Sequence, residues 1–147
     1  MEFKIDASKL TKMFAQLPRA TQNKAFRPAL RAGAKVIQQA AITNVNRVTQ
    51  EESTGLLAKS IVVRAMRKFR GMLRVSVQIK KGATYPNKTD KNGRVRVAAV
   101  GAILEYRDGG KFSWLRKASR EKAQLAINAV SSEARKNMSQ AISDAKV

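Results

Sequence analysis

A change of hydrophobic period along the chain is the feature that most constrains its fold. The sequence MLRVSVQI at 72–79 carries apolar residues at every second position, as a half-buried strand does. Apolar residues at helical spacing occur on both sides of it, at about 21–46 and about 119–142. This order predicts an α+β domain over 1–147, in which a small antiparallel sheet is packed on one face by a long N-terminal-half helix and a long C-terminal helix.

The first part of the chain is expected to be helical. Asp6 is the candidate N-cap of a short helix at 6–17, which Pro18 ends. The long helix at about 21–46 contains Pro28. That helix therefore either kinks at the proline or has its regular part begin there.

Strands are expected within about 61–104. The region 80–94, rich in Gly, Pro and Asn-Gly signals, is expected to form an extended basic loop or a hairpin tip. The run VAAVGAIL at 97–104 is interpreted as a buried strand, although its Ala-rich end also fits a helical turn. Its eight residues fall far short of the ~20 that span a bilayer as a helix, so no membrane partner is expected. Ser119 is the candidate N-cap of the helix at about 119–142.

Few residues of this chain suit catalysis. It has no cysteine and no histidine, which removes thiol nucleophiles, Cys/His metal sites and the commonest general base. Glu105 and Asp108 form either an acid-base pair or, as we favour, a structural feature in which Glu105 pairs with an arginine or caps a turn. Ser119 and Lys122 match the Ser-x-x-Lys spacing of some acyl-transfer enzymes, but a helix cap explains the serine better. Trp114 is interpreted as a core anchor rather than an interface residue. We expect no enzyme, cofactor or metal.

The charge of the chain points to an anionic partner. Lys and Arg number 30 against 10 Asp and Glu, for a formal net charge of +20. The stretch 59–96 holds twelve of the basic residues and one acid, Asp90. The partner is either DNA phosphates, bound without sequence readout, or an acidic protein surface. The residues predicted to face this partner are Arg64, Arg74, Lys80, Lys81, Lys88, Lys91, Arg94 and Arg96.

Three motifs occur in a fixed order along the chain: TGLLAKSI at 54–61, VGAILEYRDGG at 100–110 and SWLRKA at 113–118. In order and spacing they resemble the tail-completion or neck family of tailed bacteriophages, and the resemblance extends over about 10–142. Ser113 stands where that family usually has proline, and the step from glutamate to glycine is longer here. The matching residues are Thr54, Gly55, Leu56, Ser60, Ile61, Ala102, Glu105, Gly109, Trp114, Leu115 and Ala118.

The resemblance implies a structural virion protein without catalytic activity. It implies a homo-oligomeric ring at the neck, with six copies favoured and twelve as the alternative. The ring would complete the tail or join it to the head connector. Its partners would be a head-completion or adaptor protein and a tail-tube or terminator protein, with contact to genomic DNA phosphates also open. The protein would be in the host cytoplasm during assembly and then in the neck or tail of the virion. The alternative function is a non-sequence-specific DNA-binding protein that uses the basic stretch 59–96.

Overall fold

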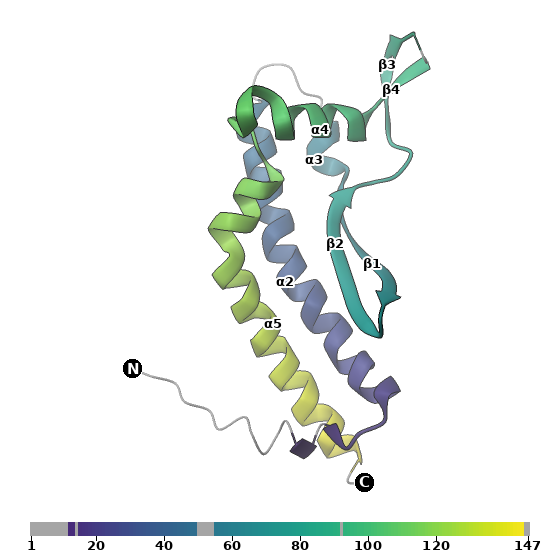
Figure 1. Ribbon diagram of the computed structural model, residues 1–147, viewed down its shortest axis with the longest axis vertical. Coiled ribbons are helices and arrows are strands. Elements are labelled where there is room, and N and C mark those ends of the chain that lie inside the picture. The colour runs from purple at the N-terminus through teal and green to yellow at the C-terminus, as the bar shows by residue number, and fades with distance from the viewer. Residues whose placement is uncertain (1–11, 14, 50–54, 92, 146–147) are drawn as a thin grey trace.

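The computed structural model of the chain describes residues 12–13, 15–49, 55–91 and 93–145 (Figure 1). Most of the short helix predicted at 6–17, including Asp6, lies outside these residues, and so does Thr54. Residues 12, 13 and 15 are helical.

Two long helices lie side by side and form the body of the molecule (Figure 1). Helix α2, Arg19–Val48, begins directly after Pro18 and runs through Pro28 without ending there. Its partner α5 extends over Leu115–Ala145. The helices approach closely at Gly33, where a Cβ atom would meet the side chain of Val130 and would lie 3.0 Å from the carbonyl oxygen of Ala126. Glycine therefore sets the separation of the two helices at this point.

The first β-hairpin lies against α2. Strand β1, Ile61–Phe69, pairs antiparallel with β2, Met72–Ile79. The two residues between them, Arg70 and Gly71, both have positive φ, as the tightest hairpin turns require. The face toward α2 carries the cross-strand pairs Ile61 with Ile79, Val63 with Val77 and Ala65 with Val75. The same pairing places Arg64 opposite Ser76 and Met66 opposite Arg74 on the outer face.

Of the two expectations for 80–94, an extended loop or a hairpin tip, the structure has the second, because a hairpin forms there. Strand β3, Thr84–Asp90, pairs antiparallel with β4, Gly93–Arg96. The register shifts between Thr84 and Thr89, and Pro86 falls in that irregular part. Proline is tolerated in a strand only at such a place, since it has no N–H to donate. This hairpin projects away from the helical body (Figure 1).

The interpretation of 97–104 as a strand is wrong. Residues Val97–Tyr106 form helix α4, which lies across one end of the two long helices (Figure 1). The buried residues of α4 are Val97, Gly101 and Glu105, each four positions after the last, so they share one helical face. Alanine and leucine favour helix, and the β-branched residues at the start of the run do not override them.

The last helix begins earlier than predicted. It starts at Leu115 rather than at about 119 and continues to Ala145 rather than about 142. Ser119 therefore lies inside the helix and is not its N-cap. The true cap is a side chain from α4, described below.

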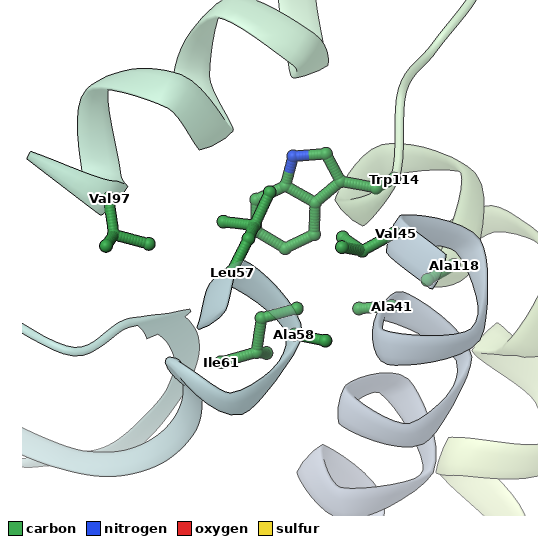
Figure 2. Packing of buried hydrophobic residues seen from close by; sticks show 8 residues of the cluster. All are labelled: Ala41, Val45, Leu57, Ala58, Ile61, Val97, Trp114 and Ala118. Atoms are coloured by element: carbon green, nitrogen blue, oxygen red, sulfur yellow. The ribbon is translucent and has the colours of Figure 1, made fainter. Parts of the chain in front are cut away.

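The core lies where α2, α4, α5 and the first hairpin meet, together with the short helix α3, Leu56–Lys59 (Figure 2). Trp114 is 4% exposed and inserts its indole between these elements. Its Nε1 donates a hydrogen bond of 2.9 Å to the carbonyl oxygen of Gly101. The core residues are Ala41, Val45, Leu57, Ala58, Ile61, Val97, Trp114 and Ala118.

The predicted α+β class is confirmed: long helices pack against small antiparallel sheets. The strands form two separate two-stranded sheets rather than one. Helix α2 packs directly on both strands of the first hairpin, whereas α5 faces β2 across a hollow lined by Val77 and Ile127. None of the helices in the described part of the chain is long and apolar enough to cross a bilayer.

Candidate functional site

The carboxylate of Glu105 joins helix α4 to the start of helix α5. Its Oε2 accepts hydrogen bonds of 2.9 Å from the backbone N–H groups of Trp114 and Leu115. Its Oε1 accepts from the Ser113 hydroxyl at 2.8 Å, and from both the backbone N–H and the Nε of Arg116 at 3.0 Å. The first N–H groups of a helix have no partner within it, and the positive end of the helix dipole favours an anion there. Glu105 is therefore the N-terminal cap of α5, supplied from another helix.

The environment of Glu105 favours its charged form. Burial disfavours the charge, since the residue is 6% exposed. Burial by itself would raise the pKa, but the hydrogen bonds from Leu115, Arg116, Ser113 and Trp114 outweigh it, and the pKa of Glu105 is lowered below 4.5. The Arg116 guanidinium is half-exposed and also lies over the Tyr106 ring, 4.9 Å from its centre.

The two carboxylates considered for catalysis have different environments. Both oxygens of Glu105 are held by donors, while the exposed side chain of Asp108 lies 3.6 Å from Arg107. Asp108 has positive φ, as do Gly109 and Gly110, so these residues form the tight turn between α4 and α5. Across 12–13, 15–49, 55–91 and 93–145, no group of three or more acidic, Cys or His residues is placed to hold a metal ion. The arrangement at Glu105 orders a helix start.

The other motif residues take positions around the same junction. Gly55 has φ 67° and precedes α3, whose first residue is Leu56. Gly109 has φ 67° in the turn after α4. Leu115 is the first residue of α5 and packs against the core next to Trp114. Gly55, Leu56, Trp114 and Leu115 thus lie at or next to element ends, while Ala102 is exposed in the middle of α4 and Gly109 is exposed in the turn.

The basic residues predicted to face a partner are all exposed. Arg64 and Arg74 lie on the outer face of the first hairpin, and Lys80 and Lys81 follow it. The other four, Lys88, Lys91, Arg94 and Arg96, belong to the second hairpin. Among the described residues, none of the eight is in an ion pair with a carboxylate.

The structure brings three of these cations together at one hollow. Arg64, Lys81 and Arg96 line a cavity of about 870 Å³ between the two hairpins, and Arg67 joins them. We call this cavity the basic hollow. Among the residues that the structure describes, no acidic side chain lines it. Its other lining residues are Ala65, Met66, Gln78, Ile79, Gly82, Thr84 and Ala98.

The remaining cations are spread over the hairpin ends. The Arg70 and Arg74 guanidiniums lie over the Phe69 ring, 5.2 and 5.7 Å from its centre. Lys88 lies 5.5 Å from the centre of the Tyr85 ring, and burial raises the pKa of the Tyr85 phenol. These two aromatic rings, the ones within the basic stretch, are therefore already in contact with cations of the same chain.

Several residues of these sites had no signal in the sequence. Ser113 and Arg116 bind Glu105 across the turn at 107–110, and this contact depends on that turn. Arg67 reaches the basic hollow next to a register shift in β1, which alternation along the strand does not predict. The four-residue spacing of Val97, Gly101 and Glu105, by contrast, is a sequence pattern that indicates a helix.

The comparison with known families identifies one match. Residues 8–106 match the family model described as "Bacteriophage HK97-gp10, putative tail-component". The match ends with α4, so Gly109, Trp114 and Leu115 lie beyond it. No curated protein and no solved structure matches the chain significantly.

Proposed function

The chain belongs to the HK97-gp10-like family of bacteriophage tail components, and from this premise we propose that it forms a ring at the neck of a tailed phage. The ring completes the tail and joins it to the head connector. The family match over residues 8–106 is the observation that carries this proposal. The protein acts as a structural part of the virion and has no enzymatic role.

Two different apolar surfaces support assembly into a ring. Met66, Phe69 and Met72 are exposed at the end of the first hairpin. Ile127 is exposed on the side of α5 that borders α2 and β2, whereas Leu125, two residues earlier in the helix, points to another side. A head-to-tail contact needs two unlike surfaces on each subunit, and a ring forms when the rotation between subunits closes. The hairpin end of one copy and the α5 surface of the next are the pair that we assign to this contact.

The α5 surface also suits contact between two highly charged copies. Val75 and Val77 of β2 and Ile127 and Val130 of α5 line a hollow of about 480 Å³ together with residues of α2. None of its lining residues is charged. In a chain of net charge +20, an uncharged concave surface lets a second copy approach without direct repulsion. The predicted ring has six copies, with twelve as the alternative.

Native mass spectrometry and negative-stain electron microscopy of the purified protein test this proposal. We expect closed rings of one defined copy number, alone or on addition of the neighbouring head-completion and tail-tube proteins. A protein that stays monomeric in the presence of both neighbours contradicts the proposal.

Non-specific DNA binding is the second candidate function. The exposed cations without carboxylate partners favour it. Affinity for duplex DNA would then fall with salt, with a log–log slope of about −0.9 per phosphate neutralised. A steep fall of DNA affinity with salt would support this candidate over the ring, provided that the protein also stays monomeric when the head-completion and tail-tube proteins are added.

A further inference from the structure

The basic hollow combines four cations with an apolar floor. Arg64, Arg67, Lys81 and Arg96 supply positive charge, and Ala65, Met66, Ile79 and Ala98 supply apolar surface. A polypeptide offers side chains of both kinds, whereas a nucleic-acid backbone offers phosphates and no aliphatic side chain. The lining therefore suits a segment of protein that alternates acidic and apolar residues.

The hollow also reaches an unpaired strand edge. β1 pairs with β2 along one edge, and no other described strand pairs with its opposite edge. Arg64, Ala65, Met66 and Arg67 are successive residues of β1, and all four line the hollow. Successive side chains of a strand point to opposite faces, so the hollow extends from the outer face round the free edge. That edge presents both N–H and C=O groups, which another strand can pair with.

The charge of β1 selects the kind of strand that can add to this edge. The pairing with β2 is regular from Ile61 to Met66, and the register shift lies between Met66 and Phe69. Ile61 is covered, since it is 2% exposed and its carbonyl oxygen accepts a 2.8 Å hydrogen bond from Gln38 of α2. The part open to a partner is therefore the exposed stretch from Arg64 to Met66. Arg64, Arg67 and Lys68 of β1 repel the same edge of a second copy, because like charges would face each other. An acidic strand would face these cations instead.

We infer that the free edge of β1 and the basic hollow bind an extended acidic segment of another protein by strand addition. Backbone hydrogen bonds to the edge hold the segment, its carboxylates pair with Arg64, Arg67, Lys81 and Arg96, and its apolar side chains contact the floor. That the segment belongs to another protein of the head–tail junction rests on the proposed function. The binding site itself consists of residues of this chain only.

Fluorescence anisotropy with the full chain and labelled probes tests the inference. The probes are a peptide of five Glu-Val repeats, a peptide of five Glu-Pro repeats with the same charge, and a duplex oligonucleotide. Proline removes the N–H groups of one edge of the peptide and fixes φ near −65°, away from the strand value, so the second peptide keeps the charge and pairs poorly as a strand. We expect the Glu-Val peptide to bind best, with affinity falling between about 50 and 200 mM salt.

Two double variants separate the site from general charge. Arg64→Glu with Arg96→Glu reverses two cations of the hollow, and we expect Glu-Val binding to weaken about tenfold or more. Arg27→Glu with Arg31→Glu reverses two exposed cations of α2, and we expect little change. Circular dichroism confirms that both variants are folded.

Four results overturn the inference. They are no binding of the Glu-Val peptide, equal binding of the Glu-Pro peptide, equal weakening by the two double variants, and tighter binding of the duplex that the hollow variant abolishes. The last of these assigns the hollow to DNA. Ring formation is measured separately on the same variants, so failure of the peptide test does not bear on the proposed ring.

Discussion

At the scale of the residue, Glu105 decides where the last helix begins. The carboxylate binds the N–H groups of Trp114, Leu115 and Arg116, which would otherwise lack acceptors. The sequence predicted a structural role for this glutamate from the absence of histidine, cysteine or a further acid nearby. It did not predict the partners, because they lie nine to eleven residues further along the chain and meet Glu105 through the turn at 107–110.

The substitution Glu105→Ala should destabilise the protein strongly. It leaves buried N–H groups at the start of α5 unsatisfied and removes the ion pair with Arg116. We expect a loss of about 2–4 kcal/mol in the free energy of unfolding, measured by urea denaturation. Glu121→Ala is the matched control, since Glu121 is exposed and lies 4.0 Å from Lys117 on one helix face. Equal effects of the two substitutions would contradict the capping role.

The contribution of Glu105 to stability should depend on pH. Its pKa in the folded protein is lower than the ordinary 4.5, so the unfolded chain binds more protons in this range. The stabilisation is therefore fully present above the unfolded value and is lost as the pH falls through the folded pKa. Urea denaturation of the native chain and of Glu105→Gln should show a stability difference that is constant above about pH 6 and shrinks below about pH 4. A difference that stays constant down to the lower pH would refute the charged cap.

At the scale of the element, helix spacing and strand pairing follow from small residues and local turns. The alternation at 72–79 indicated a strand, and in the structure Arg70 and Gly71 form the turn that joins this strand to β1. The sequence misassigned 97–104 because a short apolar run fits a strand as well as a buried helix. It left 80–94 open between a loop and a hairpin tip, because Pro86 and the basic residues also fit a loop and hide the extent of β3. Both outcomes reflect tertiary contacts that local propensity does not contain.

The close approach of α2 and α5 predicts that substitutions at Gly33 and Val130 have non-additive effects on the free energy of unfolding. Gly33→Ala places a methyl group against Val130 and near the Ala126 carbonyl oxygen, so it should destabilise the protein by about 1–2 kcal/mol despite the higher helix propensity of alanine. Val130→Ala alone creates space and also destabilises. The double variant should be more stable than the sum of the two effects by at least about 0.5 kcal/mol in thermal or urea unfolding. Strict additivity would show that the helices are not in contact at Gly33.

At the scale of the whole molecule, two hollows of different character lie on different elements. The basic hollow holds cations and no acidic side chain, while the hollow between α2, β2 and α5 holds no charge. We propose that the first hollow binds an anionic partner and that the second contacts another copy of the chain. The net charge of +20 predicted the first surface, but the second required the three-dimensional neighbours of Ile127 and Val130.

The exposed end of the first hairpin provides a test of assembly. Phe69→Ser should change the free energy of unfolding by less than about 1 kcal/mol, because the side chain is 51% exposed. The same substitution should abolish the ring or lower its copy number in native mass spectrometry. Ile103→Ser, on the exposed side of α4, is the matched control and should leave the ring intact. If Phe69→Ser forms rings as the native chain does, the hairpin end is not the contact.

Deletion of this protein from its phage tests the central claim, a ring that joins head and tail, most directly. Lysates of the deletion mutant are examined by electron microscopy, before and after purified protein is added back. We predict DNA-filled heads and separate complete-length tails, which combine into infectious particles when the protein is supplied. Joined particles in the absence of the protein, or heads that are empty of DNA, would contradict the account.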